Sequence, residues 1–253
     1  RILKIILFGS YATGKWVYKP PYGYVSDFDI LVIVNQRELL EEDKIWSLAE
    51  GRIDVKLTQP INLIVHTLQE VNEALSQGQY FFTDIKREGI VLYESDKREL
   101  AEAGNLTQEE YKAIAEKHFA KWYRSSKGFH SMYEHALTSS EYNIAAFLLH
   151  QSAEHCFTCL LLVLTNYKPP THNLSRLNSL AISQNERIAE AFQQDTKVKR
   201  RLFQLLKKAY VDARYSEHYE ITEEELLWLG ERVQCLQQIT EILCKEKIAS
   251  WEL

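Results

Sequence analysis

The sequence is poor in the residues that most often interrupt regular structure. Only 9 glycines and 5 prolines occur in 253 residues, which argues against collagen-like, low-complexity and turn-rich all-β proteins. Cysteine is also scarce, with 4 residues, and Cys156 and Cys159 lie in an apolar stretch. A disulfide framework or a zinc knuckle needs further paired cysteines. We therefore expect a mainly helical, cytoplasmic protein with reduced cysteines.

Neither charge of one sign nor a long apolar run dominates the chain. The 30 basic and 35 acidic residues give a net charge of -5, so binding to nucleic acid would need a local basic patch. The longest apolar run, residues 156–164, is shorter than the roughly 20 residues that span a bilayer, and we expect no membrane segment. The chain begins at Arg1 without a methionine or an apolar leader, so we expect it to be a piece of a longer protein.

Most glycines and prolines lie in the first part of the chain, which predicts two domains. A polar stretch over residues 94–106 leads into Thr107 and Glu110, which have the spacing of a helix-opening capping box. We expect a first domain over residues 1–95 and a second over residues 107–250.

The two domains differ in their apolar patterns. The first has short β-branched runs, typical of strands, that alternate with helical patterns; the second has only helical patterns. Strands are expected at 2–8, 28–34, 61–65 and 90–93, and helices at 36–50, 68–75, 108–137, 142–164, after Asn173, at 195–215 and at 222–248. This order predicts an α+β protein, with a small α/β unit followed by an all-α helical bundle.

Two small motifs in the first domain point to phosphate and metal chemistry. Gly9 and Ser10 follow the first strand, where glycine allows close approach to a phosphate and a hydroxyl and backbone N–H groups donate to it. Asp27 and Asp29 enter the next strand two residues apart, and alternation places both carboxylates on one face. Carboxylates together with phosphate oxygens are what Mg²⁺ prefers.

Together these motifs resemble the signature of the polymerase-beta-like nucleotidyltransferases, especially their minimal domains. The resemblance rests on Gly9, Ser10 and Gly14, followed by Ser26 and the run that begins Asp27-Phe28-Asp29. It covers roughly residues 1–95 and implies a small mixed-sheet domain. It also implies that Gly9, Ser10, Gly14 and Ser26 bind an NTP such as ATP, and that Asp27 and Asp29 bind Mg²⁺.

One position departs from the family pattern. These enzymes usually carry a third carboxylate on a following strand, and here that position falls on Asn62. An amide cannot act as a base and is a weak metal ligand. Asp54 is the nearby substitute. The loop over residues 15–25 is rich in aromatic residues; it either shapes a nucleotide or acceptor pocket by stacking, or is a packed loop.

The second domain resembles the HEPN family of helical bundles over about residues 108–250. The resemblance rests on the Leu149-His150-Gln151 to Glu154 segment, on the loop with His172, and on residues 207–215. Many HEPN domains are RNases with an Arg followed, after four to six residues, by a His. Only three residues separate Arg214 from His218, which puts RNase activity in doubt.

Each polar feature of the second domain has a functional and a structural interpretation. Arg214 and His218 form either a catalytic pair or ordinary surface contacts, and His172 is either a ligand or a cap at a helix start. His150, Gln151 and Glu154 fit a polar seam better than a metal site. Basic residues form either a solvated face or a phosphate or RNA site; they are Lys197, Lys199, Arg200, Arg201, Lys207, Lys208 and Arg214.

Two functional hypotheses follow. The first is a Mg²⁺-dependent nucleotidyltransferase that moves a nucleoside monophosphate from an NTP to a hydroxyl of a protein, an RNA or a small molecule. Similarity to aminoglycoside nucleotidyltransferases, which also pair such a domain with a helical one, includes antibiotics among the acceptors. The second is a nucleotide-binding regulatory or toxin–antitoxin-type fusion, in which Asn62 weakens the transferase and the HEPN half binds nucleotide or RNA. The HEPN resemblance also implies a homodimer formed through the helical domain.

Overall fold

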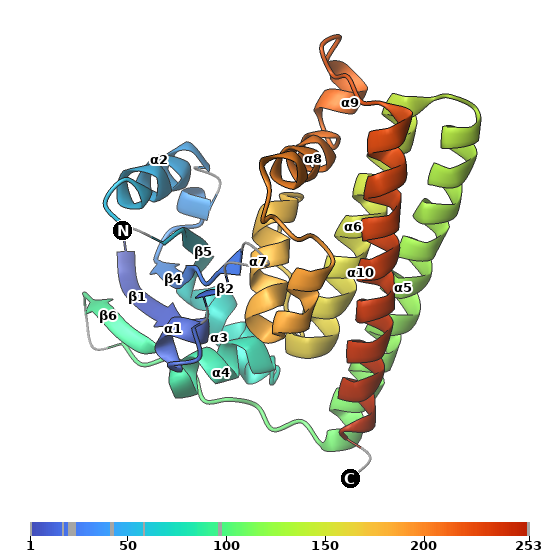
Figure 1. Ribbon diagram of the computed structural model, residues 1–253. Coiled ribbons are helices and arrows are strands. Elements are labelled where there is room, and N and C mark those ends of the chain that lie inside the picture. Colours follow the sequence, from blue (N-terminus) through green and yellow to red (C-terminus); the bar gives the residue numbers. More distant parts are fainter. Residues whose placement is uncertain are drawn as a thin grey trace. The chain divides into compact units, whose positions relative to one another are not determined.

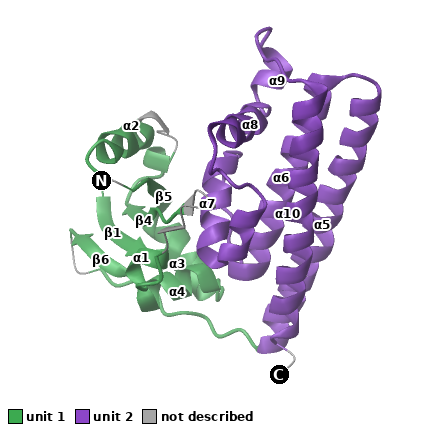
Figure 2. Cartoon of the chain, viewed as in Figure 1, with its two compact units in different colours: residues 1–18, 25–107 green, residues 19–24, 108–253 purple. Residues whose placement is uncertain are grey.

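The protein folds into two compact units, described by a computed structural model for residues 2–16, 18–19, 24–40, 43–57, 59–95 and 98–251. The first unit comprises residues 1–18 and 25–107, and the second comprises residues 19–24 and 108–253 (Figure 2). A sheet forms the first unit and helices form the second. The expected α+β class, a small mixed-sheet domain followed by a helical bundle, is therefore confirmed.

A four-stranded mixed sheet lies at the centre of the first unit (Figure 1). Its order is β5-β4-β1-β6, in which β1 runs antiparallel to β4 and β6, and β4 runs parallel to β5. Each strand falls on an apolar run that the sequence predicts. The strands are β1 (Ile2–Phe8), β4 (Phe28–Val34), β5 (Ile61–Thr67) and β6 (Ile90–Glu94), and a separate two-stranded sheet joins β2 (Tyr18–Lys19) and β3 (Tyr24–Val25).

Helices cover both faces of the four-stranded sheet. On one face, Ile30, Val32 and Leu63 pack with Trp46 in the main apolar cluster of the unit. On the other face, two helices contact β1, β4 and β5. The elements are η2 (Arg37–Leu40) and α2 (Asp43–Asp54) on the first face, and α3 (Leu68–Ser76) and α4 (Tyr80–Glu88) on the second. The sequence analysis missed α4, whose N-cap Gln79 makes no side-chain cap.

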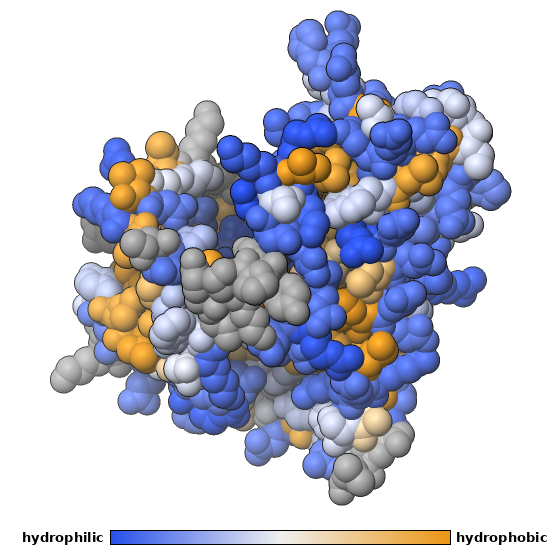
Figure 3. All heavy atoms as spheres, in the orientation of Figure 1, coloured by the Kyte–Doolittle hydropathy of each residue, from blue (hydrophilic) through white to orange (hydrophobic). Residues whose placement is uncertain are grey.

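The outer strand β6 exposes apolar side chains. Ile90, Val91, Leu92 and Tyr93 are each about half exposed, although an edge strand is usually protected by charges or proline. Figure 3 shows apolar residues gathered where Figure 1 places this strand. This edge is therefore an apolar part of the surface that runs along β1 from Leu7, opposite Ile90, to Lys4, opposite Glu94.

The second unit is a bundle built around one apolar helix. The helix α6 contributes fifteen buried residues and packs against α5 and α10. The three cysteines Cys156, Cys159 and Cys244 are buried free thiols, and Cys235 is a partly buried one. The helices are α5 (Gln108–Thr138), α6 (Tyr142–Thr165), α7 (Leu174–Gln184), α8 (Lys197–Lys208), α9 (Asp212–Tyr215) and α10 (Glu223–Ala249), with the 3-10 helix η3 (Glu186–Glu190).

By length and composition alone, α6 is apolar enough to cross a membrane, with a mean hydropathy of 1.4 over its most apolar window. The longest uninterrupted apolar run is still residues 156–164, since polar residues such as His150 and Glu154 lie in the rest of the helix. Within the protein, 67% of that window is buried, as in the core helix of a folded domain. The absence of a membrane partner stays a prediction.

The helix expected over residues 195–215 is broken in two. Thr196 caps α8 by accepting from Lys199 N, and Ala209 ends it. Tyr210 and Val211 then form a turn before the single turn of α9. The break places the Tyr210 ring in contact with the loop that precedes α7.

Candidate functional site

The chain turns sharply where β1 ends. Gly9 has φ +71° and opens the short helix α1 (Gly9–Ala12). A Cβ atom at Gly9 would lie 2.5 Å from Asp29 Oδ2, far inside van der Waals contact. Only glycine therefore suits this position, because it accepts positive φ and leaves room for the carboxylate.

Asp29 lies at the centre of the sheet, with 2% of its surface exposed. It is opposite Phe8 of β1 on one side and beside Asn62 of β5 on the other. Asn62 Nδ2 donates a hydrogen bond of 2.9 Å to Asp29 Oδ1. Asn62 thus occupies the place next to the second aspartate, where the family resemblance expects a third carboxylate.

The segment before β4 contains the other predicted ligands. Ser26 is buried and Asp27 is partly buried, and Phe28 N donates to Pro60 O at 2.8 Å, which ties the segment to the residue before β5. Gly14, with φ +73°, lies in an exposed turn. A shared metal site of Asp27 and Asp29, and nucleotide contacts of Ser26 and Gly14, stay predictions.

The Ser10 hydroxyl is a buried polar group whose hydrogen-bonding capacity is unused. Only 9% of Ser10 is exposed, and its Oγ has no hydrogen-bond partner among the described residues. An unsatisfied buried hydroxyl is costly, so this atom is suited to a ligand that accepts or donates a hydrogen bond. A phosphate oxygen beside Gly9 would satisfy it.

The donor set fits a magnesium–nucleotide complex better than a bare metal ion. No group of three or more His, Cys, Asp or Glu side chains that could hold a metal occurs in the part of the chain that the structure describes. Mg²⁺ typically uses one or two carboxylates and takes its other ligands from water and substrate phosphates, which matches Asp27 and Asp29. Asp54 is exposed, and its Oδ1 accepts from Ile61 N at 3.0 Å, at the start of β5.

The cavities described in the first unit lie elsewhere. One of about 430 Å³ is lined by Val34 and Thr67, the last residues of β4 and β5, together with Arg37 and Glu70. Asp29 and Asn62 lie near the starts of the same strands. That cavity is therefore at the opposite end of the sheet from the Gly9 turn.

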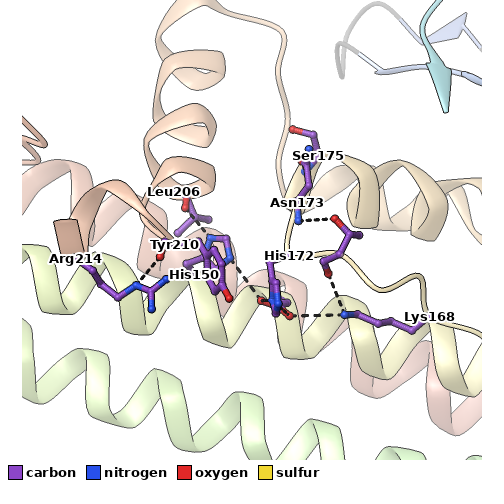
Figure 4. Close-up of polar contacts among 10 residues, drawn as sticks. His150, Lys168, His172, Asn173, Ser175, Leu206, Tyr210 and Arg214 are labelled. Carbon is purple, nitrogen blue, oxygen red and sulfur yellow. Dashed lines mark hydrogen bonds and ion pairs between the residues drawn. The ribbon is translucent and has the colours of Figure 1, made fainter. Parts of the chain in front are cut away.

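The helical unit holds a polar cluster around the buried carboxylate of Glu154 (Figure 4). His172 Nδ1 lies 2.9 and 3.0 Å from the two carboxylate oxygens, so it donates to Glu154 and its other nitrogen is available for a further bond. Burial acts to raise the pKa of Glu154, but contacts with His150 and His172 and the charges of His172 and Lys168 outweigh it and lower the pKa. Glu154 is thus an ionised carboxylate that orients a half-exposed imidazole.

His150 is the fully buried member of this cluster and lies next to Glu154. Its Nδ1 donates to Leu206 O at 2.9 Å, and its Nε2 lies 3.6 Å from Glu154 Oε2. The bond to Leu206 holds the end of α8 against α6. Of the predicted polar seam of His150, Gln151 and Glu154, His150 and Glu154 lie together and His172 joins them. Gln151 Oε1 is buried without a hydrogen-bond partner among the described residues.

Tyr210 links His172 to Arg214. The Tyr210 ring stacks on His172 with centroids 4.4 Å apart, and Arg214 Cζ lies 4.7 Å from the same ring. Arg214 Nε donates to Tyr210 O at 2.6 Å. Figure 4 shows Tyr210 between the His172 and Arg214 side chains. The arrangement presents an oriented imidazole and a guanidinium around one aromatic ring.

The structure does not bring His218 into this cluster. His218 is exposed, and its side chain makes no hydrogen bond or ion pair with the residues that are described. Of the two interpretations, this favours a surface position for His218, whereas Arg214 is linked to His172 through Tyr210. Asn173, which accepts from Ser175 N, caps α7, so the cap role expected for His172 belongs to its neighbour.

Several residues of the basic stretch have partners. Lys199 pairs with Asp195, Arg200 donates to Gln194 O, and Arg201 pairs with Glu225. These pairs favour the interpretation of this stretch as a solvated helix face. Sequence reasoning missed Tyr210 as a site residue, because nothing in the sequence shows that α8 ends at Ala209.

The second unit is thus a helical bundle with a polar site at one side of its core helix. Residues 119–247 match the HEPN domain family. Because this match covers just over half of the 253 residues, the chain belongs to the HEPN domain family, and the HEPN part of the prediction is confirmed.

No curated protein matches the chain in sequence. Among solved structures, it is similar to a nucleotidyltransferase-like protein from Exiguobacterium sibiricum 255-15, with 12% identity and a TM-score of 0.32, over 98% of this chain and 72% of that one. A score this low does not establish a shared fold, so the assignment of the first unit rests on its own residues.

Proposed function

We propose that the first unit is a Mg²⁺-dependent nucleotidyltransferase that moves a nucleoside monophosphate from an NTP to a hydroxyl acceptor. The observation that supports it best is that the Ser10 hydroxyl, which has no hydrogen-bond partner among the described residues, lies in the turn where Gly9 closely approaches Asp29. A turn that leaves a buried hydroxyl unsatisfied beside a buried carboxylate is suited to a phosphate bridged to a cation.

Each residue then has a defined task. Asp27 and Asp29 would hold Mg²⁺, which neutralises phosphate charge when it is bound. Ser10 and the backbone at Gly9 donate to phosphate oxygens. Asn62 donates to Asp29 Oδ1 and keeps that carboxylate in place.

Transfer of label from α-labelled ATP in the presence of Mg²⁺ and cell extract tests this function. We expect Asp29→Asn and Asp27→Asn to abolish transfer, whereas Asp84→Asn, at an exposed carboxylate paired with Arg87, is the matched control and keeps it. Transfer that is equal in all four proteins would refute the proposal. The labelled product identifies the acceptor as protein, RNA or small molecule, including an aminoglycoside.

A second function is supported by the polar cluster of the helical unit. His172, held by Glu154, and Arg214 carry the donors and the positive charge that a nucleotide or RNA phosphate needs. In this alternative, Asn62 marks a weakened transferase and the HEPN module binds nucleotide or RNA. Calorimetry with ATP and with a short RNA tests it: binding lost in His172→Ala and retained in His218→Ala supports the alternative, and binding unaffected by either change excludes this cluster.

We further propose a cytoplasmic homodimer formed through the helical unit. The free, mostly buried cysteines are compatible with a reducing compartment. Light scattering of the whole chain and of a fragment beginning at residue 108 measures both oligomeric states. A dimer of the whole chain with a monomeric fragment would contradict the proposed interface.

A further inference from the structure

Three aromatic rings form a stack beside the Gly9 turn. Tyr11 lies between Phe28 and Trp16: its ring centroid is 4.1 Å from that of Phe28 and 5.9 Å from that of Trp16. The planes of Tyr11 and Trp16 differ by only 6°. Parallel aromatic rings at this spacing form a flat surface on which a further π-system can stack.

The sequence positions of these rings tie the stack to the proposed nucleotide site. Tyr11 directly follows Ser10, and Phe28 lies between Asp27 and Asp29. Alternation along β4 turns Phe28 to the face opposite Asp29. The stack therefore lies on the face of β4 opposite Asp29, where it leaves the phosphate and metal positions unobstructed.

Backbone hydrogen bonds hold the outer ring in this place. Thr13 N donates to Gly9 O at 3.2 Å, and Lys15 N donates to Ser10 O at 2.8 Å. The turn is thereby folded back on Gly9 and Ser10, the two residues expected to bind phosphate. Trp16 is the next residue after Lys15, so these bonds fix the backbone that carries its ring. Trp16 is 54% exposed, so a large part of its ring is accessible to a ligand.

We propose that Trp16 is the stacking surface for the nucleobase of the NTP, an inference that rests on the nucleotidyltransferase function proposed above. Stacking on an aromatic face is tolerant of base identity, because every base has a π-face. The base is therefore held by ring contact, and purine nucleotides, with their larger rings, bind more tightly than pyrimidine nucleotides.

Calorimetry with two probes, Mg·ATP and Mg·triphosphate without a nucleoside, tests this role apart from turnover. We expect Trp16→Ala to weaken ATP binding by about 5- to 100-fold, as loss of one stacked base does, and to leave triphosphate binding unchanged. Trp16→Phe keeps a ring and retains most of the ATP affinity. Tyr93→Ala, at a half-exposed ring of β6, is the matched control and has no effect.

The other outcomes overturn the inference in distinguishable ways. Equal ATP affinity in the wild type and Trp16→Ala would show that Trp16 does not meet the base, while the nucleotide site itself would stand. Equal weakening of ATP and triphosphate would assign Trp16 to the phosphate end or to folding. Absence of binding of both probes to the wild type would refute the nucleotidyltransferase function, and the base contact with it.

Discussion

The substitution Gly9→Ala tests whether the turn after β1 is built around Asp29. The new methyl group would lie 2.5 Å from Asp29 Oδ2 and 3.3 Å from its Cγ, in a backbone with φ +71°. Asp29 has little freedom to retreat, since it is 2% exposed and its other oxygen accepts from Asn62. Two separate costs therefore act on the folded state.

A substitution at a second glycine separates the cost of the backbone conformation from the cost of the clash with Asp29. Gly14 has φ +73° but nothing within 4 Å of a built Cβ, so Gly14→Ala should cost only the left-handed backbone term of about 1–2 kcal/mol. Gly9→Ala adds the cost of forced overpacking, about 1–3 kcal/mol. We expect a total loss for Gly9→Ala of about 2–5 kcal/mol in the stability of the first unit.

Hydrogen exchange measured by mass spectrometry on peptides from β1 and β4 reports the stability of this unit separately from the helical one. The expected order of protection is wild type, then Gly14→Ala, then Gly9→Ala. If Gly9→Ala lost no more protection than Gly14→Ala, the close contact with Asp29 would be refuted, and the argument for a phosphate turn would lose its geometric basis.

Two further predictions concern the helical unit. The folded-state pKa of Glu154 lies below its usual 4.5, so the wild type should be more stable to urea than Glu154→Gln above about pH 5. This difference in the free energy of unfolding should be lost as the pH falls through the lowered pKa. A difference that stays constant from pH 7 to pH 3 would contradict this. Gly230→Ala should destabilise the helical unit by about 1–3 kcal/mol, because the new Cβ would overlap the buried Tyr133 hydroxyl. Gly128→Ala has open space at its Cβ and should stabilise the same unit by about 0.5–1 kcal/mol. Equal melting shifts for the two variants would count against the packing described here.

Strands and long helices were predictable because their signals are local. β1 and β4 begin and end at the predicted residues, since continuous β-branched runs mark buried strands. The capping box at Thr222 likewise predicted the start of α10. α4 was missed because its start has no side-chain cap.

The site residues were only partly predictable, because tertiary contacts decide them. The family resemblance placed Asn62 at the position of a third carboxylate, and the structure pairs its side chain with that of Asp29. The partnership of His172 with Glu154 and Tyr210 joins residues 18 and 38 positions apart in the sequence, through a loop and a helix end that no periodic pattern marks. His218, which the sequence places after Arg214 at a spacing shorter than the HEPN pattern, lies outside the cluster.

The amide at position 62 has a consequence for how the proposed transfer depends on pH. Because position 62 carries an amide in place of a third carboxylate, the Asn62 side chain cannot accept the proton of the acceptor hydroxyl. The rate of the wild type should then rise by about tenfold per pH unit over the neutral range, as for reactions that need a deprotonated nucleophile without a general base.

Asn62→Asp restores a carboxylate at this place, so its rate should be higher near neutral pH and should level off once the new group is ionised. The change also places two carboxylates side by side where Asn62 Nδ2 donates to Asp29 Oδ1, and like charges in a buried site repel. The variant should therefore melt at a lower temperature in EDTA and recover in Mg²⁺ with ATP. Parallel pH–rate profiles in the two proteins would show that position 62 takes no part in proton transfer, and that the weakened-transferase interpretation of Asn62 is wrong.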